Sequence, residues 1–125
     1  MDAALRQLVR RRAGDRCEYC RLAQSMEPLS LHIEHIVSRQ HGGTDSPDNL
    51  ALACHHCNLR KGTNLTAIDP DTGLLTRLFH PRQDVWEQHF IARAGEVTGR
   101  TAVGRATVRL LRMNDTGRLQ LRALQ

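Results

Sequence analysis

The sequence predicts a small α+β domain that gains stability from a metal site. Three observations support this prediction: two CxxC pairs, a segment in which apolar and polar residues alternate, and segments of helical periodicity near both ends. The chain has 125 residues, of which 40% are hydrophobic, but only one Trp, one Tyr and two Phe. Its core is therefore modest and mainly aliphatic, and a second stabiliser would help it.

The first helix is expected over Asp2 to Ala13. Asp2 suits the N-cap, Leu5, Leu8 and Val9 fall on one helical face, and Gly14 follows as a stop. Several arginines occupy the remaining positions. A solvated face is the ordinary reason for such arginines, although their charge also suits phosphate contacts.

A half-buried strand is expected within Leu29 to Val37, where apolar and polar residues alternate. His32 and Glu34 would share one face of this strand. His35 falls on the other face of a regular strand, so a twist or bulge would be needed to aim His35 and Glu34 at one site. Residues 38–48 predict a loop, residues 50–53 a second short strand, and a helical turn opens at His55 or His56.

The C-terminal part carries weaker signals. Residues 63–80 are rich in turn-forming residues and predict an irregular segment packed against the core, and residues 85–99 are ambiguous. Thr101 suits the N-cap of a helix with apolar residues at helical spacing up to Met113, and a last short helix follows the break at residues 114–117. His80 and His89 are isolated, which favours structural roles.

The charge balance indicates the kind of partner. Lys and Arg number 18 against 13 Asp and Glu, which gives a formal charge of +5. This excess favours a polyanionic partner, although any soluble basic protein would share it. No apolar stretch approaches the roughly 18 residues that a membrane span needs, so we expect a cytoplasmic protein with no membrane partner.

The four cysteines form two matched pairs, Cys17-Glu18-Tyr19-Cys20 and Cys54-His55-His56-Cys57. Cytosolic thiols stay reduced, so this pattern indicates a metal rather than disulfides, and each pair can offer two thiolates to one tetrahedral zinc ion. Four unrelated free cysteines are the alternative. His55 or His56 could also replace a cysteine as a ligand, but we favour all four cysteines.

A family resemblance follows from the residues between and just after these pairs. The runs HIEHIVSRQHGG, DNLALAC and CHHCNLRKG resemble the HNH endonuclease family, the His-Me finger nucleases. The resemblance implies a ββα-metal core with two zinc knuckles over residues 17–62. An N-terminal helix at residues 1–16 and a mainly helical extension at residues 63–125 would complete a single domain.

The resemblance also implies roles for individual residues. His35 would be the general base, Asn49 would hold the loop that carries it, and Glu34 and Asn58 would bind the catalytic cation. The family more often has Asp and His at these two metal positions, but Glu34 and Asn58 still offer the oxygen ligands that suit Mg²⁺ or Mn²⁺. His32 is a candidate third ligand or substrate contact, with a structural role as the alternative.

The implied activity is metal-dependent hydrolysis of DNA that leaves 3′-hydroxyl and 5′-phosphate ends. Such chemistry needs a base, a cation and groups that hold the backbone, and Arg39, Arg60 and Lys61 could supply the last. One centre cuts one strand, so duplex cleavage would need a homodimer or two encounters. The rival interpretations are a non-catalytic zinc-stabilised nucleic-acid-binding module and a structural or protein-interaction zinc domain without salt-dependent DNA affinity.

Overall fold

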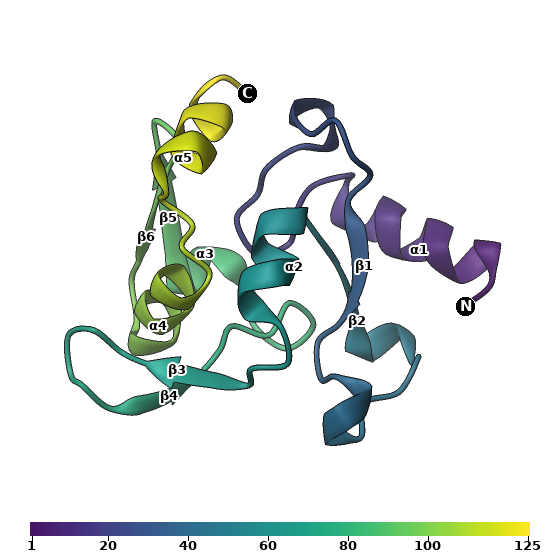
Figure 1. Ribbon diagram of the computed structural model, residues 1–125, viewed down its shortest axis with the longest axis horizontal. Helices are drawn as coiled ribbons and strands as arrows, with labels where there is room; N and C mark the ends of the chain where they lie inside the picture. Colours follow the sequence, from purple (N-terminus) through teal and green to yellow (C-terminus); the bar gives the residue numbers. More distant parts are fainter.

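The computed structural model describes residues 1–125 and combines helices with three two-stranded antiparallel sheets (Figure 1). The helices are α1 (Ala3–Ala13), α2 (His55–Lys61), α3 (Trp86–His89), α4 (Ala102–Leu110) and α5 (Thr116–Ala123), with single 3₁₀ turns at Gln24–Met26, Arg39–His41 and Pro47–Asn49. The strands are β1 (His32–His35), β2 (Leu50–Ala53), β3 (Thr66–Ile68), β4 (Leu75–Arg77), β5 (Phe90–Arg93) and β6 (Glu96–Gly99). The predicted α+β class is confirmed.

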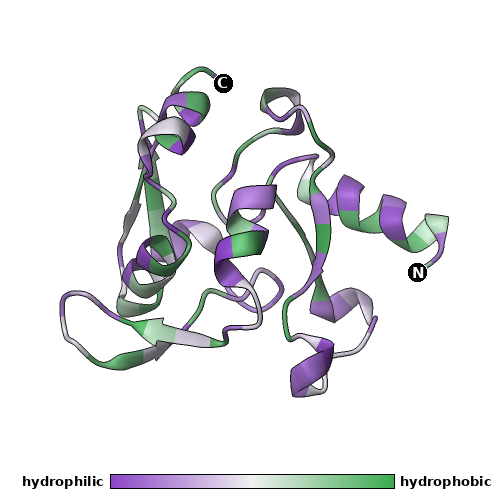
Figure 2. Ribbon diagram, viewed as in Figure 1, coloured by the Kyte–Doolittle hydropathy of each residue, from purple (hydrophilic) through white to green (hydrophobic).

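Helix α1 begins and ends where the sequence predicts. The Asp2 carboxylate accepts a hydrogen bond from the Leu5 amide at 2.8 Å, and Gly14 closes the helix with a left-handed backbone (φ 64°). Hydrophilic and hydrophobic residues alternate around this helix in Figure 2. Its buried residue, Val9, belongs to the core, and the Arg12 guanidinium donates to the Leu50 carbonyl at 2.7 Å, which fixes α1 to the start of β2.

The centre of the fold is a ββα unit. Strands β1 and β2 pair in a regular antiparallel register, from His32 opposite Ala53 to His35 opposite Leu50. Helix α2 begins directly after β2 and the intervening Cys54. All four residues of β2 are buried, which explains their continuous apolar character. The observed strand β1 is shorter than the predicted segment because the chain beyond Ile36 bonds to the loop rather than to β2.

The extension contains more strand than the turn-rich sequence led us to expect. The turn residues Asp69 to Gly73 close the β3–β4 hairpin, with the Asp69 amide donating to the Leu74 carbonyl at 2.9 Å. The ambiguous residues 85–99 form α3 and the β5–β6 hairpin, whose two-residue turn has positive φ at Ala94 and Gly95. The predicted N-cap of α4 is confirmed, since Thr101 accepts from the Gly104 amide at 3.0 Å. The predicted last short helix is present as α5, but it begins at Thr116, inside the break expected at residues 114–117.

One cluster of 19 buried residues runs through both halves of the molecule. In Figure 1, α1, β1 and β2 lie on one side of α2, and β5, β6, α4 and α5 lie on the other. The Trp86 indole in the extension donates to the Tyr19 carbonyl between the first two cysteines at 2.8 Å. The extension therefore packs on the same core as the ββα unit. None of the helices combines the length and apolar composition that a membrane crossing requires.

Candidate functional site

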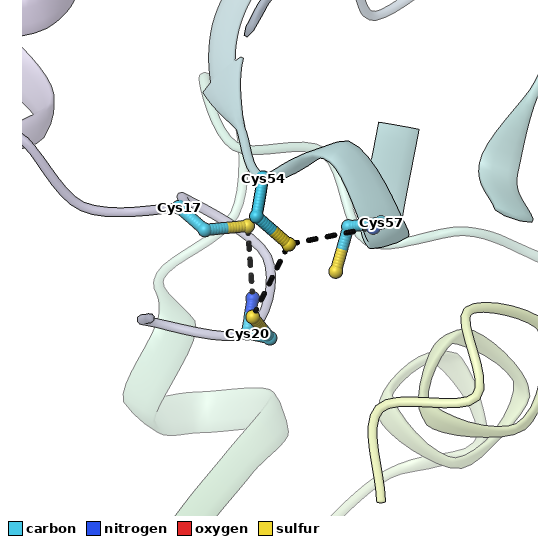
Figure 3. A group of neighbouring side chains, drawn as sticks. All are labelled: Cys17, Cys20, Cys54 and Cys57. Atoms are coloured by element: carbon cyan, nitrogen blue, oxygen red, sulfur yellow. Dashed lines mark hydrogen bonds between the residues drawn. The ribbon is translucent and has the colours of Figure 1, made fainter. Parts of the chain in front are cut away.

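The four cysteines converge at the base of the ββα unit (Figure 3). Their sulfur atoms all lie within 4.8 Å of one another, and each side chain is buried. A zinc ion with Zn–S bonds of about 2.3 Å places its sulfur ligands about 3.8 Å apart. The Cys20 and Cys54 sulfurs lie 3.8 Å apart, so the cluster fits a tetrahedral structural zinc.

Backbone geometry supports the same conclusion. The Cys20 amide points at the Cys17 sulfur (3.5 Å) and the Cys57 amide at the Cys54 sulfur (3.4 Å), which are donors that stabilise thiolates in a metal knuckle. Burial raises the pKa of Cys17, the direction expected for a buried thiol with no cation beside it. His56 instead contacts the Arg112 carbonyl, and the four cysteines are the residues positioned to form a zinc site.

Glu34 points into the interior, where two residues hold it. The Tyr19 hydroxyl donates to one carboxylate oxygen, and the Lys61 ammonium lies 3.4 Å from the other. The Lys61 ammonium also donates to the Ile36 carbonyl at 2.9 Å. Burial raises the pKa of Glu34, while the charge of Lys61 opposes this shift. A carboxylate on β1 thus links the first zinc knuckle to the last turn of α2.

This arrangement corrects one expectation. Lys61 is 2% exposed, and its charge is used by Glu34 and by backbone carbonyls. It cannot contact a DNA backbone from this position. The sequence did not reveal this because a basic residue after a zinc knuckle looks like a surface residue until its neighbours in space are known.

His35 lies on the opposite face of β1 and meets the loop. Its Nε2 lies 2.7 Å from the Asp45 carboxylate, and the Arg39 guanidinium donates to the same carboxylate oxygen at 2.9 Å. The hydrogen bond with His35 is the main cause that lowers the pKa of Asp45, so Asp45 is a carboxylate at neutral pH. An Nε2–H that donates to Asp45 leaves Nδ1 of His35 as the proton acceptor.

The loop that carries Asp45 is fixed by Asn49. The Asn49 side chain accepts from the Val37 amide at 2.9 Å and donates to the carbonyls of Val37 (2.9 Å) and Thr44 (2.8 Å). Gly43 passes so close to the first residues of the loop that a Cβ there would lie 1.7 Å from the Val37 carbonyl oxygen. By joining the two ends of the loop, these contacts of Asn49 are suited to the loop-holding role that the resemblance implies.

Comparison with known proteins agrees with this layout. Residues 17–64 match the family model for HNH endonuclease. We refer to these matched residues as the HNH segment. A search of the curated proteins and a search of the solved structures each gave no match. The HNH segment begins at the first zinc cysteine and ends just beyond α2, so it contains both cysteine pairs, the ββα unit and His35, and it suggests nuclease activity.

Within the HNH segment, the residues expected at one site form three separate groups. His35 meets Asp45 and Arg39, Glu34 meets Tyr19 and Lys61, and His32 meets His55. The expected bulge in β1 is absent because the β1–β2 register is regular. Side chains therefore alternate across the strand, and His35 and Glu34 face opposite ways.

The remaining candidates lie nearer the surface. Asn58 is half-buried on α2, one residue after the last zinc cysteine, and no protein group bonds to its amide side chain. Arg60 is exposed on the same helix, and the Arg39 side chain is 71% exposed on the strongly hydrophilic turn Arg39–His41 (Figure 2). Both arginines can reach a polyanion.

Three partners were missed at the sequence level. Asp45 lies in a polar loop, where acidic residues are common, and Tyr19 looks like a spacer between two cysteines. The sequence offers His55 as a helix start or an alternative zinc ligand, not as a partner of His32. No local pattern identifies these residues, since each contact joins segments that are distant in the sequence. His80 and His89 make local structural contacts, to the Arg82 amide and to the Thr101 hydroxyl.

Proposed function

We propose that this protein is a metal-dependent DNA endonuclease that hydrolyses phosphodiester bonds by water attack. The observation that carries the proposal is the contact of His35 with Asp45 inside an HNH segment. A histidine oriented by a carboxylate, with the exposed Arg39 on the same carboxylate, is suited to take a proton from water beside a phosphate.

In this proposal His35 is the general base and acts through Nδ1. Asp45 accepts from Nε2–H and stabilises the imidazolium that forms when the ring takes a proton. Asn49 fixes the loop, so that Asp45 stays at hydrogen-bond distance from His35. The two groups together supply the base and its orientation.

Glu34 and Asn58 are the proposed ligands of a catalytic Mg²⁺ or Mn²⁺, with His32 as a candidate third ligand. The oxygen donors of Glu34 and Asn58 suit such hard cations, which would offset negative charge on the phosphate and the leaving oxygen. Lys61 now neutralises Glu34. Cation binding would require Glu34 to exchange its contact with the Lys61 ammonium for the metal.

Arg39 and Arg60 are the proposed backbone contacts, since both are exposed, and Lys61 is removed from that set. Contacts of this kind read charge rather than sequence. We further propose that residues 1–16, 17–62 and 63–125 act as one domain, an assignment that the shared core supports. Duplex cleavage then needs two copies or two encounters, because each chain carries one His35.

The test is incubation of zinc-loaded protein with supercoiled plasmid in the presence of Mg²⁺ or Mn²⁺. Nicked product is expected with the parent. His35→Ala should lower the nicking rate by about 100- to 10,000-fold while DNA binding persists. His41→Ala, an exposed histidine on the adjacent turn, is the matched control. Equal nicking by the parent and a folded, zinc-containing His35→Ala protein would reject the assignment of the base.

A second candidate is a zinc-stabilised nucleic-acid-binding module without catalytic activity. The specific observation that favours it is the buried Glu34–Lys61 ion pair, which occupies the carboxylate that the cation needs. This candidate predicts salt-dependent DNA binding and no nicking with any divalent cation. A protein that neither binds DNA nor cuts it would instead be a structural zinc domain.

A further inference from the structure

Two histidines from different elements meet beside the zinc knuckle. His32 is the first residue of β1 and His55 is the first residue of α2, and their Nε2 and Nδ1 atoms lie 3.2 Å apart. The ring centroids are 5.3 Å apart with the planes tilted by 41°, so the rings are not stacked. The two ring nitrogens lie at hydrogen-bond distance, so without a metal one ring donates an N–H to the other, and a bound ion would replace that proton.

The backbone positions of β1 and of the start of α2 bring the two histidines together. His32 pairs with Ala53 in the β1–β2 register, and His55 follows Ala53 after the zinc ligand Cys54. A zinc ion held by Cys54 would fix the turn that leads from β2 into α2. Both imidazoles are therefore attached to backbone whose positions are set by other interactions, which lowers the entropic cost of binding a ligand between them.

The spacing of the two nitrogens is that of a chelating pair. Metal–imidazole bonds of about 2.0–2.1 Å in a tetrahedral site place two nitrogens about 3.3–3.4 Å apart. Neutral imidazole prefers borderline ions such as Zn²⁺, Ni²⁺, Co²⁺ and Cu²⁺, whereas Mg²⁺ prefers oxygen ligands. His55 is exposed and His32 half-exposed, so an ion can reach them from solvent and keep water as its other ligands.

We propose that His32 and His55 form a second metal site, which binds a borderline divalent transition-metal ion. It is separate from the four-cysteine cluster, differs in donor type from the oxygen ligands Glu34 and Asn58, and assigns His32 to this site rather than to the proposed catalytic cation. The proposal does not depend on nuclease activity. An ion held here would connect β1 to α2 on the face of β1 that Glu34 shares, and it would stabilise the folded chain through linkage.

The experiment titrates Ni²⁺ into the untagged, zinc-loaded full chain by calorimetry, with zinc content measured before and after. The parent should bind one Ni²⁺ per chain without losing zinc, and its thermal midpoint should rise by a few degrees in excess Ni²⁺. His32→Ala and His55→Ala should each weaken Ni²⁺ binding at least about tenfold, because each variant loses one of the two imidazole ligands. His41→Ala should bind like the parent.

Absence of a Ni²⁺ site in the parent would overturn the proposal, and so would undiminished binding by zinc-containing His32→Ala and His55→Ala proteins. If an alanine variant loses zinc, His32→Gln and His55→Gln are scored instead, since glutamine keeps side-chain volume and a hydrogen-bonding group. Ni²⁺ uptake that displaces zinc in equal amount assigns the binding to the cysteines and also overturns it. Nicking activity is not a readout here, so a failed nuclease proposal leaves the result unaffected.

Discussion

The pairing of His35 with Asp45 gives the most direct residue-level test of mechanism. The Asp45 carboxylate sets which ring nitrogen of His35 carries the proton, through a contact of 2.7 Å. A carboxylate that orients an imidazole in this way acts on the chemical step and not on substrate binding. Asp45 is thus a positioning residue in the proposed mechanism.

Asp45→Asn should lower kcat for plasmid nicking by about 10- to 100-fold, as removal of an orienting partner typically does, while KM stays close to that of the parent. Asp48→Asn is the matched control, because Asp48 is an exposed acid of the same loop that does not contact His35. Measurement of initial nicking rates over a range of plasmid concentrations separates the two constants. A parent-like kcat for Asp45→Asn would show that Asp45 has no part in the reaction.

The corrected role of Lys61 leads to a second prediction at this scale. Lys61→Met leaves the buried Glu34 carboxylate without its cation, which should cost about 3–5 kcal/mol of unfolding free energy. Adding Glu34→Gln should restore much of that loss, since no buried charge then remains. Urea unfolding of the single and double variants measures this coupling.

Arg60→Ala is the contrasting variant on the same helix. Arg60 is exposed, so this change should leave unfolding nearly unchanged and weaken DNA binding, with a shallower dependence on salt. If Lys61→Met weakened DNA binding without loss of stability, Lys61 would be a surface contact after all.

At the scale of elements, the sequence predicted features that depend on short-range patterns. The caps of α1 and α4, the strand around Glu34 and the four-cysteine set follow from spacing and side-chain chemistry. The contacts of His35 with Asp45 and of Glu34 with Lys61 could not be predicted in this way. They depend on which face of β1 meets the loop and which meets α2. The β3–β4 hairpin was missed because its turn residues are equally typical of an irregular segment.

Gly43 is the position where loop backbone packing is tightest. In Gly43→Ala the new Cβ would overlap the Val37 carbonyl, so the loop must shift, at an expected cost of about 1–3 kcal/mol. The shift would also move Asp45 relative to His35 and reduce nicking. Gly117→Ala is the control, because that site in α5 has open space and should gain about 0.5–1 kcal/mol. Equal stability of the two variants in urea unfolding would contradict this account of the loop.

At the scale of the whole molecule, the four-cysteine cluster is part of the hydrophobic core that joins the HNH segment to the extension. Tyr19, which lies between two zinc cysteines, bonds through its carbonyl to Trp86 in the extension and through its hydroxyl to Glu34 on β1. The cysteines themselves are members of the buried cluster that reaches Leu111 and Met113. Loss of the metal should therefore affect the extension as well as the HNH segment.

Removal of zinc should unfold the whole chain rather than the HNH segment alone. Thiolate ligands brought together only by folding make metal binding and folding one equilibrium, and a core with few aromatic residues has little stability in reserve. Cys17→Ser and Cys54→Ser should each lose both zinc and cooperative unfolding.

Treatment of the parent with a strong chelator should abolish the helical circular dichroism and the near-ultraviolet signal of Trp86. Restoration by Zn²⁺ but not by Mg²⁺ identifies the thiolate site as the cause. Elemental analysis that finds well-folded protein without zinc would contradict the prediction, and a Trp86 signal that survives chelation would show that the extension folds without the metal.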